Sequence, residues 1–135
     1  MLTRKQDWQL HFEKCVSENY NKKFEWGTHD CCLWAANLVL AITGTDIAEK
    51  FRGTYSTAKD AQHILKEFGG VAELCTKYTG KEPVSPLLAA VGDLVLTDYM
   101  GQHTMAVCNG ETLLATGVDG LVSLPMLAAL KAWRI

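Results

Sequence analysis

The sequence predicts an α+β domain in which helices come first and a small antiparallel sheet follows. Three observations lead to this prediction. Apolar residues in the first half recur at helical spacing. The second half contains short strand-like runs that are separated by turn residues. Helices and strands are therefore segregated along the chain, which is typical of α+β folds.

The length and composition fit one such domain over residues 1–135. A chain of 135 residues can bury a core without disulfides or metals. Its 48% of hydrophobic and 21% of charged residues are ordinary values for a globular protein. The net charge is −2 and the basic residues are scattered, so the sequence offers no basic surface for nucleic acid or anionic lipid. We therefore expect neither a nucleic-acid nor a membrane partner.

Four helices are expected in the first half. The first covers about residues 3–18, where Trp8, Phe12, Cys15 and Val16 form an apolar stripe. It is amphipathic, and a loop follows it.

The second expected helix covers residues 31–43 and is apolar on nearly every face, which predicts a central, buried position. Asp30 precedes this helix as an N-cap, and Gly44 follows it as the C′ residue. The longest near-apolar run, residues 31–42, contains Asn37 and is too short to span a bilayer.

A third helix is expected to begin after Thr57, which with Asp60 approximates a capping box. Gly69 and Gly70 end it, and a shorter helix over residues 71–78 follows.

The second half is expected to form the sheet. Asn109 and Gly110 lie between two of its runs as a hairpin turn signal. A short helix is expected over residues 126–130. The expected strands are residues 93–96, 104–108, 112–115, 121–124 and 132–135.

The cysteines and the N-terminus bear on the compartment. The five cysteines are an odd number without C-x-x-C spacing, and no signal-peptide core begins the chain. The run from His29 to Cys32 does not suggest a metal site, because consecutive residues on one turn do not converge on a tetrahedral ion. We expect a soluble, reduced protein that is made in the cytoplasm, with no cofactor and no metal. Later delivery by a particle or a secretion machine stays open.

Cys31 is the leading candidate for chemistry. With Asp30 as the cap, Cys31 occupies the first helical position, where the helix end favours thiolate over thiol. The carboxylate of Asp30 acts in the opposite direction. The alternative is that Cys31 is a small buried side chain, as free cysteines often are. Its neighbour Cys32 is expected to pack on the apolar stripe of the helix.

Two histidines are candidates for a general base. His103 follows a Gly-Gln loop and opens a strand, and its alternative role is a solvated histidine at a loop edge. His29 is closer to Cys31 in sequence, where a loop histidine usually serves capping or solvent contact. His11 and His63 lie on expected helices and are expected at the surface.

These motifs resemble two families. A buried helix that carries Cys, followed by a sheet, resembles the NlpC-type branch of the papain-like cysteine peptidases. The motifs that match it are Trp26-Gly27, Asp30-Cys31, Gly92-Asp93-Leu94-Val95 and His103. Nearly the whole chain also looks like a family encoded among phage and prophage tail genes. The motifs that match this second family are residues 24–27, 30–31, 43–46, 52–55, 117–122 and 132–134.

The first resemblance implies a papain-like fold and a cysteine hydrolase that cleaves peptide amide bonds, with bacterial peptidoglycan as the substrate. It implies Cys31 as the nucleophile and His103 as the general base. Trp26 and Asp30 flank the nucleophile and are expected to contact the substrate. The second resemblance implies phage tail proteins as partners.

Two departures from the enzyme pattern keep other functions open. Phe24 stands where these enzymes usually have Tyr. The position that orients the imidazole falls on Leu114, with Thr116 as a possible substitute in the third catalytic role. The alternative function is an inactive papain-like domain that serves as a structural or assembly component of a phage tail. A small thiol-dependent transferase is a further, weaker alternative.

Overall fold

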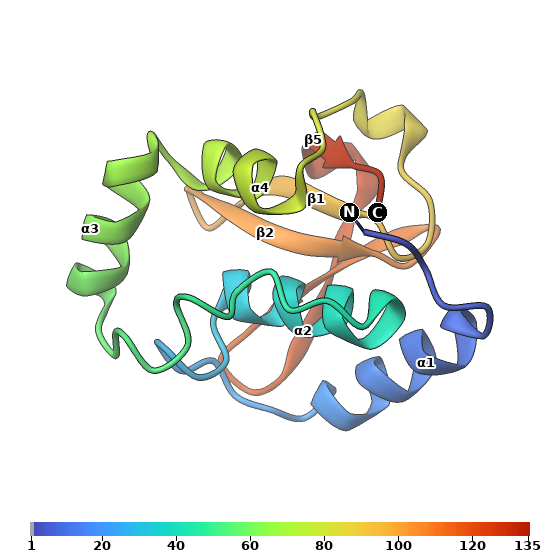
Figure 1. Cartoon of the computed structure of the whole chain (residues 1–135), viewed down its shortest axis with the longest axis horizontal. Coiled ribbons are helices and arrows are strands. Elements are labelled where there is room, and N and C mark those ends of the chain that lie inside the picture. Colours follow the sequence, from blue (N-terminus) through green and yellow to red (C-terminus); the bar gives the residue numbers. More distant parts are fainter. Residues whose placement is uncertain (1) are drawn as a thin grey trace.

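The α+β prediction is confirmed by the computed structural model, which describes residues 2–135 (Figure 1). In these residues, four α-helices precede one antiparallel sheet with the strand order β4-β3-β2-β1-β5. The helices are α1 (Trp8–Asn19), α2 (Cys31–Thr43), α3 (Ala58–Phe68) and α4 (Val71–Thr79). The strands are β1 (Leu94–Tyr99), β2 (Gln102–Cys108), β3 (Thr112–Thr116), β4 (Leu121–Pro125) and β5 (Ala129–Trp133).

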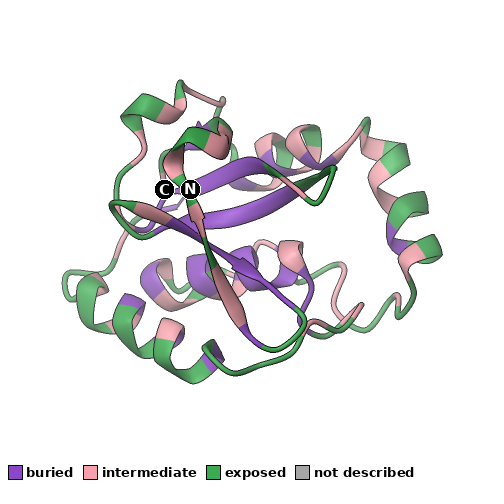
Figure 2. Ribbon diagram, turned by 180° about the vertical axis from the view of Figure 1, so that it is seen from behind, coloured by how far each residue is buried: buried purple, intermediate pink, exposed green. Residues whose placement is uncertain are grey.

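The main core lies between α2 and one face of the sheet, as Figure 2 shows by the buried residues of α2 and the central strands. Trp34 is fully buried there, and its indole N–H donates to the carbonyl of Leu114 at 3.0 Å. Helix α4 packs against the same core through Val71 and Cys75. The sequence predicted this central position of α2 correctly.

Both ends of α2 follow from local signals. The side chain of Asp30 accepts a hydrogen bond from the N–H of Leu33 at 3.0 Å, so it is the N-cap. Gly44 ends the helix with φ of 82°, and its N–H donates to the carbonyl of Leu40. The predicted boundaries of this helix are therefore confirmed.

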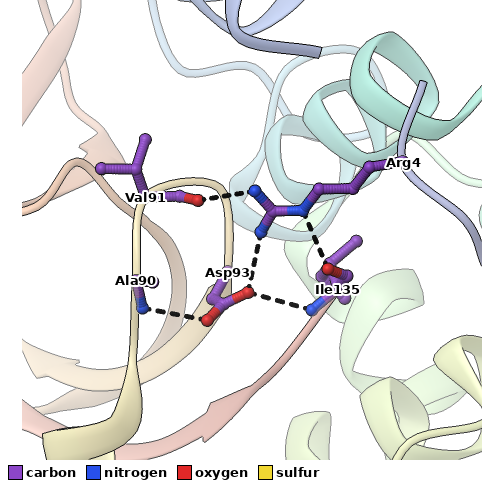
Figure 3. Close-up of polar contacts among 5 residues, drawn as sticks. All are labelled: Arg4, Ala90, Val91, Asp93 and Ile135. Carbon is purple, nitrogen blue, oxygen red and sulfur yellow. Dashed lines mark hydrogen bonds and ion pairs between the residues drawn. The ribbon is translucent and has the colours of Figure 1, made fainter. Parts of the chain in front are cut away.

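The first helix begins later than expected, at Trp8 instead of Thr3. Figure 3 shows the reason: the Arg4 guanidinium donates to the carbonyls of Val91 and Ile135 and forms an ion pair with Asp93 at 3.0 Å. These partners lie far away in sequence. The segment before α1 is held outside the helix by them, and the helical spacing of its residues does not reveal this.

The expected helix over residues 126–130 is wrong. A 3-10 turn covers Met126–Ala128, and β5 begins at Ala129 and pairs with β1. Strands β1 and β2 are also longer than expected. They meet in a tight hairpin in which Met100 and Gly101 both have positive φ, of 52° and 76°.

Within residues 2–135, no helix has the length and apolar character needed to cross a bilayer.

Candidate active site

A cavity of about 680 Å³ lies among α2, β2 and the α3–α4 pair. It is lined by five residues that the sequence nominated, although they come from three separate segments of the chain. These residues are Trp26, Asp30, Cys31, His103 and Thr116. The fold therefore gathers the candidate nucleophile, base and orienting group around one space.

Three hydrogen bonds on the buried carboxylate of Asp30 fix the place of Cys31. Besides the bond from Leu33, Asp30 accepts from the N–H of Gly27 at 3.0 Å and from the hydroxyl of Tyr55. Gly27 has φ of 78°, and a Cβ on it would lie 2.1 Å from the carbonyl oxygen of Tyr55. Only glycine permits this close approach, which joins the loop before α2 to the segment that carries Tyr55.

The pKa of the Cys31 thiol is lowered from its ordinary value. The largest cause is hydrogen bonding with the Cys32 thiol, whose sulfur lies 4.0 Å away. Burial raises the pKa, the backbone N–H of Met105 lowers it, and the Asp30 carboxylate raises it. The pKa of Cys32 is raised well above its ordinary value, chiefly by the hydrogen bond with Cys31. Of this pair, Cys31 therefore loses its proton more readily than Cys32.

The pKa values of the other three cysteines are shifted in the opposite direction from that of Cys31. Burial raises the pKa of Cys15 to about 11 and that of Cys75 to about 12, and it also raises that of Cys108. All three are buried, whereas Cys31 is half-buried at the cavity. The lowered pKa distinguishes Cys31 from these three thiols, one of which, Cys75, also lines the cavity.

His103 lies near the start of β2, exposed to solvent and at the edge of the cavity. Strand alternation puts it on the same face as Met105, which packs in the core beside α2. In the part of the chain that the structure describes, no hydrogen bond joins His103 to Cys31 or Thr116. His103 and Cys31 therefore line the same cavity, with no hydrogen bond between them among residues 2–135.

Thr116 ends β3 and is buried, and its hydroxyl oxygen has no hydrogen-bond partner among residues 2–135. Strands β2 and β3 pair at Val107↔Leu114 and Cys108↔Leu113, and this pairing ends before Thr116. Thr116 lies beyond these pairs and lines the cavity. Leu114, the other residue considered for the orienting role, has its side chain in the main core.

The expectation for His29 is wrong. It is only 3% exposed, and burial lowers its pKa. Its ring lies 6.2 Å from that of Trp34, centroid to centroid, so it packs inside the protein instead of contacting solvent. It is not among the residues that line the cavity.

Sequence reasoning missed two residues near the site, Tyr55 and Asp98. Tyr55 brings a hydroxyl to Asp30 from a distant segment. Phe24, which the sequence analysis did single out, packs edge-on against Trp26 with the ring centroids 4.8 Å apart. Asp98 lies directly opposite His103 in the β1–β2 ladder, although the described residues show no ion pair between them. The sequence could have revealed Asp98, because the position of the tight hairpin turn sets the register between β1 and β2. No local signal identifies Tyr55.

Comparisons with known proteins give one match. No curated protein and no solved structure matches the chain. A family model with the description "Domain of unknown function (DUF6950)" matches residues 3–135. Because this match covers nearly the whole sequence, the chain belongs to the DUF6950 family.

Proposed function

We propose that this protein is a cysteine hydrolase that cleaves amide bonds of a peptide substrate. One observation carries the proposal: the thiol with the lowered pKa stands at the first position of α2 and opens into a large cavity that a histidine also lines. Nucleophilic thiols in hydrolases need a low pKa, access to substrate and a nearby base.

In the proposed reaction, the Cys31 thiolate attacks the amide carbonyl carbon. The C–S bond forms, the C–N bond breaks, and His103 in its protonated form donates a proton to the departing amine. A water molecule then adds to the thioester and gives a proton to His103, which releases the acid and restores the thiolate. The backbone N–H groups at the start of α2 stabilise the oxyanion. The unpaired hydroxyl of Thr116 orients the imidazole once a bound substrate draws His103 inward.

The resemblance to NlpC-type enzymes makes a peptidoglycan peptide the first substrate to test, with Trp26 and Asp30 beside it. The resemblance to the tail-encoded family makes phage tail proteins the proposed partners and a phage particle the proposed destination. A papain-like arrangement of α2 and the sheet belongs to the same proposal.

The test is digestion of purified peptidoglycan, followed by mass spectrometry of the released peptides. We expect new peptide termini with the wild type and none with Cys31→Ala, while Cys108→Ala, at a thiol that does not line the cavity, keeps its activity as the matched control. His103→Ala is expected to lower kcat by about 10²–10⁴-fold. Full activity in Cys31→Ala would contradict the proposal.

The second candidate is an inactive domain that serves in tail assembly. It is favoured by the absence of a hydrogen bond between His103 and Cys31 in the described residues and by Phe24 at the Tyr position. Equal, slow alkylation of all five cysteines would support this candidate over the hydrolase.

A further inference from the structure

The walls of the cavity are apolar far beyond the immediate surroundings of Cys31. Asp30 is the only carboxylate among the lining residues, and none of them is Lys or Arg. Both carboxylate oxygens of Asp30 are already engaged, one by Leu33 and the other by Gly27 and Tyr55. Apart from Cys31 and His103, the lining within residues 2–135 therefore offers no free charged group to neutralise a charged ligand.

The part of the cavity away from His103 lies between helices. Its lining there is mainly apolar and includes Ala36 on α2, Ala61 and Leu65 on α3, and Val71 on α4. Gln62 on α3 and Tyr78 on α4 add two polar side chains. The backbone groups inside a helix are bonded to one another, so such walls present few hydrogen-bond partners. A peptide main chain that entered would leave buried amides unpaired, which is unfavourable. A hydrocarbon chain has no such groups to satisfy.

We propose that the cavity holds an uncharged aliphatic acyl chain, so that the substrate is an N-acylated amine or peptide whose acyl carbonyl is presented to Cys31. This inference rests on the proposed function and narrows its substrate. The polar amine side of the substrate then lies at the mouth, beside exposed His103 and Met100. The charged stems of cell-wall peptides do not enter the cavity, because burial of an unpaired charge is strongly unfavourable.

The volume agrees with a chain of medium length. A methylene group fills about as much space as a water molecule, roughly 30 Å³, so ten carbons need about 300 Å³. The cavity of about 680 Å³ accommodates this chain with room for the amide. Pockets of this size that are lined mainly by apolar side chains are typical small-molecule sites.

The first test is hydrolysis of a series of acyl 4-nitroanilides that share one leaving group. We expect kcat/KM to rise at least about ten-fold from butyryl to octanoyl, because the added methylenes leave water for apolar walls. The glutaryl compound, which ends in a carboxylate, is the charged control and is expected to react far more slowly than the pentanoyl compound. Equal rates along the series, or a preference for glutaryl, would overturn the inference.

A variant that narrows the cavity gives a second test. Ala61→Leu adds bulk to the wall on α3 and is expected to lower kcat/KM for octanoyl at least about ten-fold while butyryl is little affected. Ala58→Leu makes the same change on the same helix, at a residue that does not line the cavity, and is expected to leave both rates unchanged. Thermal unfolding of both variants checks that they fold, and the acyl series on the wild type does not depend on them.

Binding without chemistry separates the two proposals. Octanamide, a neutral amide, is titrated calorimetrically into Cys31→Ser, which cannot turn over. Saturable binding that Ala61→Leu weakens would support the acyl site even if the wild type hydrolyses nothing, in which case the proposed function fails alone. Cleavage of peptidoglycan with no binding of octanamide and no chain-length preference would overturn the acyl site alone.

Discussion

Replacement of Asp30 by Asn tests how the start of α2 is held. The Asn side chain keeps an oxygen that can accept from Leu33, so the N-cap survives. The other position becomes an NH₂ group, which faces two donors, the N–H of Gly27 and the hydroxyl of Tyr55. The tyrosine hydroxyl can rotate and accept, but the amide of Gly27 cannot.

The expected loss of stability follows from these contacts. A hydrogen bond to a charged group contributes about 1.5–3 kcal/mol, and Asp30 is only 2% exposed. One such bond is lost outright and the other is weakened. We therefore expect Asp30→Asn to lower the free energy of unfolding by about 2–4 kcal/mol. Asp60→Asn, at an exposed position in the first turn of α3, is the matched control and is expected to change it by less than about 0.5 kcal/mol.

The same substitution is expected to make Cys31 more acidic. The negative charge of Asp30 raises the pKa of the Cys31 thiol, and Asn removes that charge. The variant should therefore be less stable, yet its Cys31 should react with an alkylating reagent at lower pH than in the wild type. Urea unfolding measures the first effect and pH-dependent alkylation the second. The reasoning fails if stability is unchanged, or if the alkylation midpoint stays in place or moves to higher pH.

Two other predictions concern neighbouring residues. Gly27→Ala is expected to destabilise the protein by about 3–5 kcal/mol, since the positive φ and the clash with Tyr55 add together. Gly53 has φ of 76° and nothing near the position of a Cβ, so Gly53→Ala should lower the free energy of unfolding by only about 1–2 kcal/mol. Equal losses for the two variants in urea unfolding would refute the clash between the Cβ added by Gly27→Ala and Tyr55. His29 has a lowered pKa in the folded state, so the unfolded chain binds more protons as the pH falls below about 6.5 and stability declines. When the pH is lowered from about 7.5 to about 5.5, the free energy of unfolding should fall less in His29→Phe than in the wild type or in His63→Gln. Equal falls in all three proteins would contradict a His29 that is buried in its neutral form.

The sequence predicted elements whose limits are set locally. Helix α2 was placed correctly at both ends because Asp30 and Gly44 act on their own turns of the helix. The start of α1 was misplaced because Arg4 is held by Val91, Asp93 and Ile135, which are distant from it in sequence. The helix near residue 128 failed for a similar reason, since the pairing of β5 with β1 outweighs a local helical pattern.

For the site, the sequence nominated residues but not their surroundings. Cys31 was nominated from its place at a helix start, and His103 from its place at a strand start. The contact between Tyr55 and Asp30 and the apolar lining of the cavity depend on how the loop before α3 packs on α2. Such long-range packing leaves no pattern in a single sequence.

The central claim is that Cys31 is the reactive thiolate of this chain. It is tested most directly by the rate of iodoacetamide labelling at each cysteine across a range of pH, with fragment-ion mass spectrometry to separate Cys31 from Cys32. The account predicts that Cys31 is labelled fastest, with a midpoint below the ordinary thiol value of 9.0 and below that of Cys32. A Cys31 midpoint at or above that of Cys32, or labelling no faster than that of buried Cys75, would contradict it.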